Sequence, residues 1–160
     1  MSDAGAVWML RFQELVAHMQ SGPKADLTVN LSLPLSADAL ARDVLRHTPP
    51  RPLAIEQAIE RVEDAVMPAR ARLPEAFRLQ TDDALLWAMV SDGGADPPKA
   101  EPIWLSTDAI EQLFNRLVAR AEGRPASQDA LPVDPASAAR LIALREMLHH
   151  WGLDGVQLLR

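Results

Sequence analysis

The segment 27–40 reads LTVNLSLPLSADAL and contains the transition that decides the fold class. Its first nine residues, 27–35, alternate between leucine or valine and smaller side chains, which is the two-residue period of a half-buried strand. Pro34 cannot donate to a strand ladder, so we expect the end of this strand to be unpaired or at a sheet edge. Ser36 then supplies a helix N-cap, and Asp38 faces the positive end of the helix dipole. The segment predicts a strand that runs directly into a helix.

The same junction pattern occurs at two further places. Segments 81–85 (TDDAL) and 106–110 (STDAI) repeat it, and each follows a short strand-like stretch, at 77–80 and 103–105. The copies lie 45 and 25 residues apart, and this irregular spacing argues against a solenoid repeat. We predict three strand-to-helix junctions, which make some parallel strand pairing plausible.

Four segments have the apolar spacing of an amphipathic helix. In 53–67 the side chains of Ile55, Ile59, Val62 and Val66 share one stripe, and Pro68 is expected to end the helix. Segment 107–121 is followed by a glycine stop, and segment 134–151 opens on an N-cap Asp before Pro. The fourth helix is predicted at the N-terminus, on the apolar positions Trp8, Phe12, Leu15 and Met19, with Gly22 and Pro23 closing it.

The remaining segments complete the predicted fold. Residues 84–90 suit a helix or the second strand of a hairpin, and we favour the helix. A last strand is possible at 156–159, and 91–102 and 123–132 have loop composition. We predict one globular domain over 1–160 of the α+β or α/β class, dominated by about six helices with a small sheet of three or four strands. A mostly α fold is the alternative.

Composition restricts the classes of function. The chain has no Cys, which excludes disulfides and Cys-ligated metal sites. Its formal net charge of −6 disfavours binding to nucleic acid. The apolar run at 6–10 is too short for a signal peptide or a membrane span, so we expect a cytoplasmic protein with no membrane partner.

The strongest candidate for a chemically active site is a cluster near the C-terminus, formed by Glu146, His149, His150 and Trp151. A Glu-x-x-His spacing on a helix places a carboxylate and an imidazole on one face, as in metal-binding helix bundles. Such centres need a second Glu-x-x-His motif and two further carboxylates, whereas this sequence contains only a single copy of the motif. Histidine near a helix end is also explained by its favourable interaction with free carbonyl groups and the helix dipole. We interpret all four histidines as capping residues, and keep a metal or proton-transfer role as the alternative.

Two charged groups are further candidates. Arg70, Arg72 and Arg78 form a basic patch that could bind a phosphate or carboxylate, although we favour a structural pairing with the acidic helix at 53–67. That helix carries Glu56, Glu60, Glu63 and Asp64, which we interpret as a solvated face.

The sequence contains no Walker A loop and no Gly-x-Gly-x-x-Gly, His-Glu-x-x-His or Gly-x-Ser-x-Gly motif. We therefore predict a non-catalytic bacterial cytoplasmic accessory domain that acts through protein contacts as a homodimer, without cofactor or metal. The first alternative is a small enzyme or metal-dependent protein that uses the Glu/His cluster near 146–150. The second is a regulatory domain that binds a small anion.

Overall fold

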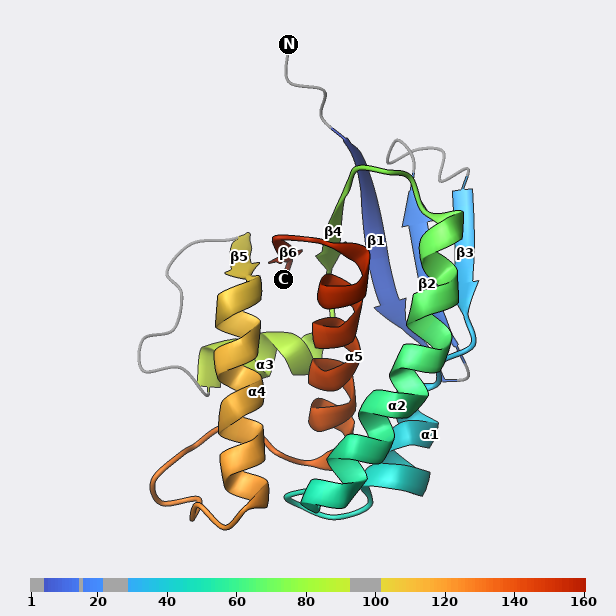
Figure 1. The fold of residues 1–160 in the computed structure, drawn as a ribbon. Helices are drawn as coiled ribbons and strands as arrows, with labels where there is room; N and C mark the ends of the chain where they lie inside the picture. The colour runs from blue at the N-terminus through green and yellow to red at the C-terminus, as the bar shows by residue number, and fades with distance from the viewer. Residues whose placement is uncertain (1–4, 15, 22–28, 93–101) are drawn as a thin grey trace.

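In the computed structural model of the protein, the described residues are 5–14, 16–21, 29–92 and 102–160. These residues form a six-stranded mixed sheet and five α-helices (Figure 1). The strands are β1 (Ala6–Phe12), β2 (Ala17–Ser21), β3 (Val29–Leu33), β4 (Phe77–Thr81), β5 (Ile103–Ser106) and β6 (Gly155–Leu158). The α-helices are α1 (Ala37–Ala39), α2 (Pro52–Ala69), α3 (Ala84–Asp92), α4 (Thr107–Ala121) and α5 (Pro135–Trp151). A π-helical segment, η1 (Leu40–Leu45), follows α1, and a 3₁₀ turn, η2 (Arg70–Arg72), follows α2.

The order of strands in the sheet is β3-β2-β1-β4-β6-β5. Strands β1, β2 and β3 form an antiparallel meander, whereas β1 pairs with β4, and β4 with β6, in parallel. The edge strand β5 runs antiparallel to β6. The carboxyl ends of the parallel strands β1, β4 and β6 therefore lie side by side at the same end of the sheet. After β1 the chain continues to β2 and after β4 it continues to β5, in opposite directions along the strand order, and α/β sheets commonly bind ligands at such a switch point.

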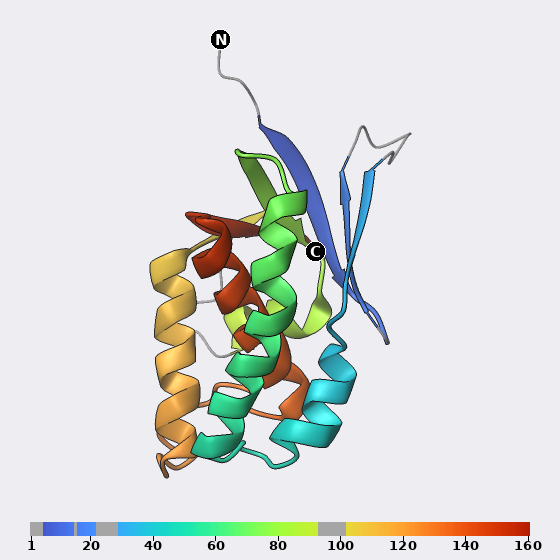
Figure 2. The same ribbon diagram turned by 45° about the vertical axis from the view of Figure 1, so that its right-hand side comes forward.

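The helices pack on one face of this sheet. Alternate strand residues such as Leu10, Leu79 and Val156 are buried beneath them. Helix α5 lies between α2 and α4 and packs against both (Figures 1 and 2). Most of α5 is buried around its whole circumference, which explains why apolar residues follow one another there without a polar stripe. The opposite sheet face carries half-buried or exposed side chains, among them Met9 and Gln80, which are partners in the β1–β4 register.

The expected size of the sheet is wrong. A small sheet of three or four strands with about six helices was predicted, and the described residues contain six strands and five α-helices. Most of the difference comes from the N-terminus, where the predicted helix is the β1–β2 hairpin. Trp8 and Leu10 are buried and Val7 and Arg11 are exposed, so the segment follows a strand period. Apolar Met9 on the open face hides this alternation in the sequence.

Several other segments agree with the sequence. Helices α4 and α5 have the predicted bounds to within a residue, and residues 84–90 are helical. Helix α2 includes the predicted segment 53–67, but the expectation that Pro68 ends it is wrong, because the helix continues through Pro68 to Ala69. Strand β3 (Val29–Leu33) confirms the alternating segment up to Leu33, two residues before its predicted end, and the first two predicted residues lie outside the described part of the chain. The predicted loop at 91–102 also falls mostly outside that part.

The three junctions are confirmed, with one change of capping residue. Ser36 Oγ accepts from the amide of Ala39 at 3.0 Å, and Ser106 Oγ from the amide of Ala109 at 3.1 Å. At the middle junction the cap is Asp83, whose Oδ1 accepts from the two amides at 85 and 86 at 3.1 and 3.0 Å. Within the described residues, no helix has both the length and the apolar character required to cross a membrane.

Candidate functional site

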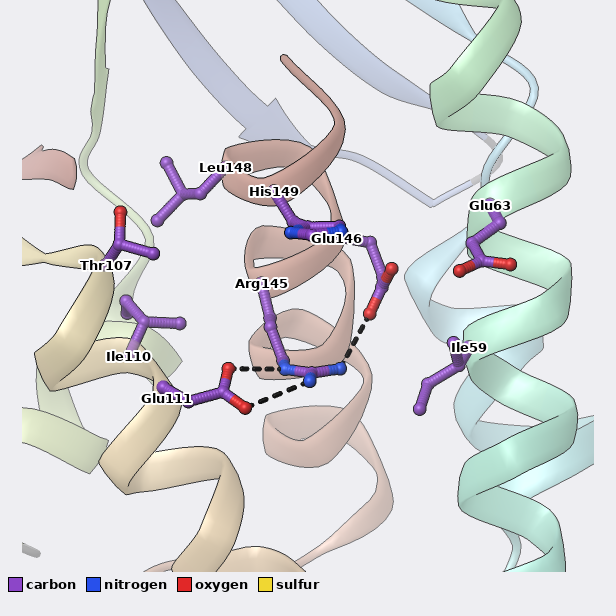
Figure 3. A pocket seen from close by; sticks show the side chains of 9 residues that line it. All are labelled: Ile59, Glu63, Thr107, Ile110, Glu111, Arg145, Glu146, Leu148 and His149. Atoms are coloured by element: carbon purple, nitrogen blue, oxygen red, sulfur yellow. Dashed lines mark hydrogen bonds and ion pairs between the residues drawn. The ribbon is translucent and has the colours of Figure 1, made fainter. Parts of the chain in front are cut away.

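A cavity of about 210 Å³ lies between α2, α4 and α5 (Figure 3). Its lining combines apolar side chains near its ends with charged groups at its centre. The lining residues are Ile59, Glu63, Thr107, Ile110, Glu111, Arg145, Glu146, Leu148 and His149. Charged side chains from three helices thus converge over the middle of α5.

Arg145 is the central cation of this cavity. Its Nε and Nη2 donate to the two carboxylate oxygens of Glu111 at 2.7 and 3.0 Å, and its Nη1 donates to Glu146 Oε1 at 2.9 Å. The guanidinium also lies 4.0 Å from the ring centroid of Phe114. The bond from Arg145 lowers the pKa of Glu111 because it stabilises the charged carboxylate. Three of the five N–H groups of the Arg145 guanidinium are therefore bonded to two carboxylates of the protein itself.

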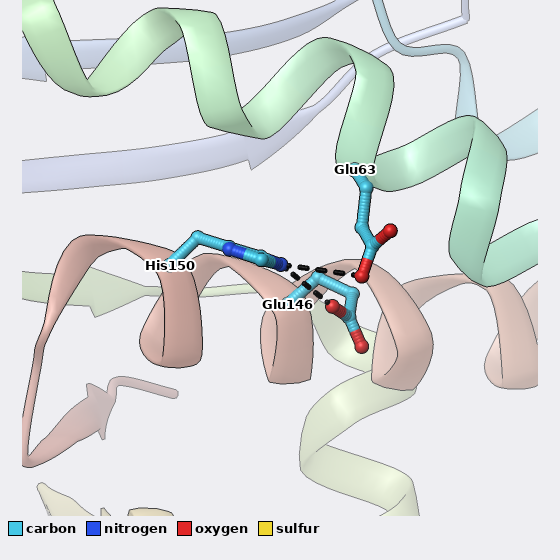
Figure 4. A group of neighbouring side chains, drawn as sticks. All are labelled: Glu63, Glu146 and His150. Carbon is cyan, nitrogen blue, oxygen red and sulfur yellow. Dashed lines mark hydrogen bonds and ion pairs between the residues drawn. The ribbon is translucent and has the colours of Figure 1, made fainter.

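Glu146 is the buried member of the group. Its side chain is 4% exposed, and burial raises its pKa, an effect that the neighbouring Glu63 reinforces. Its second oxygen, Oε2, lies 3.2 Å from His150 Nε2, which also lies 3.3 Å from Glu63 Oε1 (Figure 4). Within the described residues, these three side chains are the one group of His and carboxylate ligands whose donor atoms all lie within 4.8 Å of one another.

The sequence-predicted cluster divides in the structure. Glu146 and His150 point toward each other at spacing i, i+4, so the pairing uses His150 where the Glu-x-x-His motif suggested His149. His149 is exposed, lines the cavity and contacts the His150 ring edge-on, with centroids 4.9 Å apart. Trp151 is a core residue, and its indole N–H donates to the carbonyl of Val66 at 2.9 Å.

The predicted arginine patch does not converge on one site. Arg70 donates to three consecutive backbone carbonyls, those of Leu73, Pro74 and Glu75, and thereby fixes the turn before β4. Arg72 and Arg78 are exposed on the surface. The other two histidines are also apart: His18 lies on β2 beside Ser32, and His47 is exposed after η1.

A second charged group lies at the carboxyl ends of β1 and β4. On the open sheet face, Arg11 Nη2 donates to Asp82 Oδ2 at 3.3 Å, and the two side chains are 45% and 41% exposed. On the helix face, Arg140 Nε donates to Asp83 Oδ2 at 2.9 Å, with side chains only 12% and 10% exposed. Buried Thr81, the residue before Asp82, donates its hydroxyl to the carbonyl of Leu10 at 2.8 Å. An Arg–Asp pair thus flanks each face of the sheet at its switch point.

Sequence reasoning missed Glu63 as a partner of His150, and missed both Arg–Asp pairs. Glu63 was recognised as part of an acidic helix face, but its partner lies 87 residues away. The 81–83 segment was recognised as a junction, and its placement after a buried strand was the available signal. The contribution of β1 was hidden because that segment was interpreted as a helix.

Comparison with known proteins identifies the fold. No family model matches the sequence, and no curated protein matches it. Among solved structures, the Ppx/GppA phosphatase of Aquifex aeolicus (type II variant) has a TM-score of 0.75 at 13% identity, over 99% of this chain and 54% of that chain. An exopolyphosphatase from Cytophaga hutchinsonii has a TM-score of 0.71 at 12% identity, over 98% of this chain and 54% of that one. An exopolyphosphatase-like protein has a TM-score of 0.66 at 13% identity, over 99% of this chain and 57% of that one.

These likenesses correct the leading functional hypothesis. The similar structures named above are those of a phosphatase, an exopolyphosphatase and an exopolyphosphatase-like protein, and this likeness contradicts the prediction of a non-catalytic accessory domain. The chain spans about half the length of the solved proteins that it matches. At 12–13% identity, what it shares with them is the α/β fold of the Ppx/GppA phosphatases.

Proposed function

We propose that this chain is a lobe of a phosphatase, an enzyme that hydrolyses phosphate esters or phosphoanhydrides. The fold that it shares over 99% of its length with a Ppx/GppA phosphatase supports this reaction class. The observation that carries the proposal is the Arg11–Asp82 pair, which lies where β1 and β4 end side by side at the switch point of the sheet. The chain spans about half of the length of each matching protein. That it carries out phosphate hydrolysis is therefore also proposed.

The chemistry of the pair suits a phosphoryl group. The Arg11 side chain is nearly half exposed, and a guanidinium presents a planar fork of donors that matches two phosphate oxygens. Arg11 holds Asp82 through one bond of 3.3 Å, and an incoming phosphate can replace that carboxylate. Asp82 is then free to accept a proton from the attacking water and orient it toward phosphorus.

The second pair positions the first. Asp83 caps α3 and receives Arg140 from α5, so the backbone directly after Asp82 is fixed by buried contacts. Asp38 is also 3.9 Å from Arg140, which leaves this cation surrounded by carboxylates. In the proposed site Arg140 is a positioning residue, whereas Arg11 binds phosphate and Asp82 directs water.

Phosphate release from tripolyphosphate and p-nitrophenyl phosphate tests the proposal. We expect Asp82→Asn to lower kcat about 100-fold, the usual size of a lost acid–base group, without raising KM. Arg11→Gln is expected to raise KM about tenfold, because it removes a charge-assisted bond to phosphate. The matched control is the exposed pair Arg42–Asp43, whose variants Arg42→Gln and Asp43→Asn should leave both constants unchanged. Failure of the wild-type chain to release phosphate faster than Asp82→Asn would contradict the proposal.

We also propose that the chain acts as a homodimer in the cytoplasm. The absence of Cys is consistent with a reducing compartment, and two edge strands carry exposed apolar side chains, Val29 on β3 and Trp104 on β5. Light scattering coupled to size-exclusion chromatography measures the mass. A mass of two chains supports the dimer, and a mass of one chain at micromolar concentration rejects it.

A further inference from the structure

The side chains of Glu63, Glu146 and His150 meet between α2 and α5 (Figure 4). Hydrogen bonds among the three do not satisfy all of their polar atoms. His150 Nε2 faces two carboxylate oxygens, at 3.2 Å from Glu146 and 3.3 Å from Glu63. A ring nitrogen carries either one proton or one lone pair, so it can give one full hydrogen bond. Two carboxylates and an imidazole aimed at one point are the arrangement that a cation between them would satisfy.

The buried carboxylate is oriented by groups outside the cluster. Glu146 is 3% exposed, so water does not solvate it freely. Its Oε1 accepts from Arg145, which is itself fixed by Glu111, and its Oε2 is thereby directed at His150. Holding one oxygen of a carboxylate so that the other points at a cation is how outer-shell residues support metal ligands in proteins. This support comes from α4 and α5, independently of Glu63 on α2.

The surroundings leave room to complete a coordination sphere. The cavity of about 210 Å³ borders both Glu63 and Glu146, so water can supply the remaining ligands. One imidazole with two carboxylates suits Zn²⁺ or Mn²⁺, whereas Ca²⁺ takes oxygen ligands throughout. We propose that Glu63, Glu146 and His150 form a divalent cation site, for Zn²⁺ or Mn²⁺, that ties α2 to α5.

This site is separate from the proposed phosphate site, and it does not depend on the proposed function. Arg140 lies on α5 six positions before Glu146, and its side chain is directed to Asp83, just after the carboxyl end of β4. The ligands of the cation site come from the middle of α2 and the last two turns of α5. We therefore expect the cation to stabilise the fold, with no part in hydrolysis.

Thermal unfolding of untagged, chelator-treated protein tests the site. At a hundredfold excess of Zn²⁺ or Mn²⁺ over its Kd, the wild-type Tm should rise by about 5–11 °C, and Ca²⁺ should have little effect. His150→Gln and Glu63→Gln should each lose most of that rise. Glu63 is 38% exposed in its side chain, so its variant is expected to fold and gives a valid comparison. The matched control is His149→Gln, which changes the adjacent imidazole on the same helix turn and should keep the full rise.

A direct readout separates binding from folding. The visible absorption of added Co²⁺ should appear in the wild type and in His149→Gln, and should be lost in His150→Gln. Two results would overturn the site: wild-type protein with no metal-dependent rise in Tm and no Co²⁺ spectrum, or a rise of unchanged size in both His150→Gln and Glu63→Gln. Glu63→Gln should keep its phosphatase activity, because the cation site is separate from the proposed phosphate site. The two proposals can therefore fail independently of each other.

Discussion

Arg140 Nε donates to Asp83 Oδ2 at 2.9 Å, and this buried bond joins the first half of α5 to the residue that caps α3. The guanidinium also lies 5.6 Å from the ring centroid of Phe12, at the end of β1. One side chain therefore connects β1, the end of β4 and α5 at the edge of the sheet where we place phosphate chemistry. The geometry of that edge depends on a pair of charges that are almost fully removed from water.

Breaking this buried pair should be costly. Arg140→Gln leaves the carboxylate of Asp83 buried without its cation, and we expect a loss of about 3 kcal/mol in the free energy of unfolding. Denaturant titration measures the loss. Arg42→Gln removes an exposed ion pair and is expected to leave the denaturation midpoint unchanged. Equal behaviour of the two variants would show that the Arg140 pair has no special role in stability.

Asp129 predicts a measurable acid dependence of stability. The Arg116 guanidinium bonded to it lowers the pKa of Asp129 from its usual 3.8 to about 2, and its side chain is 5% exposed. Because the folded state holds this proton more weakly than the unfolded state, the contribution is fully present above pH 3.8 and is lost as the pH falls toward 2. The shift corresponds to about 2 kcal/mol. The free energy of unfolding, measured by denaturant titration, should fall less between pH 5 and pH 2.5 in Asp129→Asn than in the wild type. An equal fall in the two proteins would contradict this prediction.

Gly155 is expected to be intolerant of any side chain. A Cβ at this position would collide with the backbone carbonyl oxygen of Leu105, and would lie 2.6 Å from the ring of Trp104. The ring can move, but the carbonyl belongs to the β5–β6 ladder, in which Gly155 is paired with Ser106. We expect Gly155→Ala to cost about 2 kcal/mol or more. The double variant with Trp104→Ala should recover little of this loss, and full recovery would locate the strain in the ring instead.

The sequence was most informative where a helix has one polar side or a clear cap. Segment 107–121 shows an apolar stripe and a Ser106 cap, and both are present in α4. It was least informative where tertiary pairing decides the structure. The sequence between β1 and β2, 13–16, contains no Gly, Pro, Asn or Asp, and Met9 interrupts the polar side of the alternation in β1. Helical spacing was therefore a reasonable but wrong interpretation.

The candidate sites follow the same division. The sequence placed Glu146, His149 and His150 together on one helix, but its Glu-x-x-His spacing suggested the wrong histidine as the partner of Glu146, and the approach of Glu63 depends on how α2 packs against α5. The meeting of Arg11 with Asp82 requires the parallel pairing of β1 with β4, which joins segments 71 residues apart. Spacing along one element was predictable, and contacts between elements were not.

An NMR titration of the chain with tripolyphosphate tests the central claim most directly, because it locates the phosphate without requiring turnover. The account predicts that backbone amides at 11 and 82, at the carboxyl ends of β1 and β4, shift in proportion to bound ligand. It also predicts that Arg11→Gln weakens binding about tenfold. Absence of binding, or shifts confined to the cavity around Arg145, would contradict the placement of phosphate chemistry at this edge of the sheet.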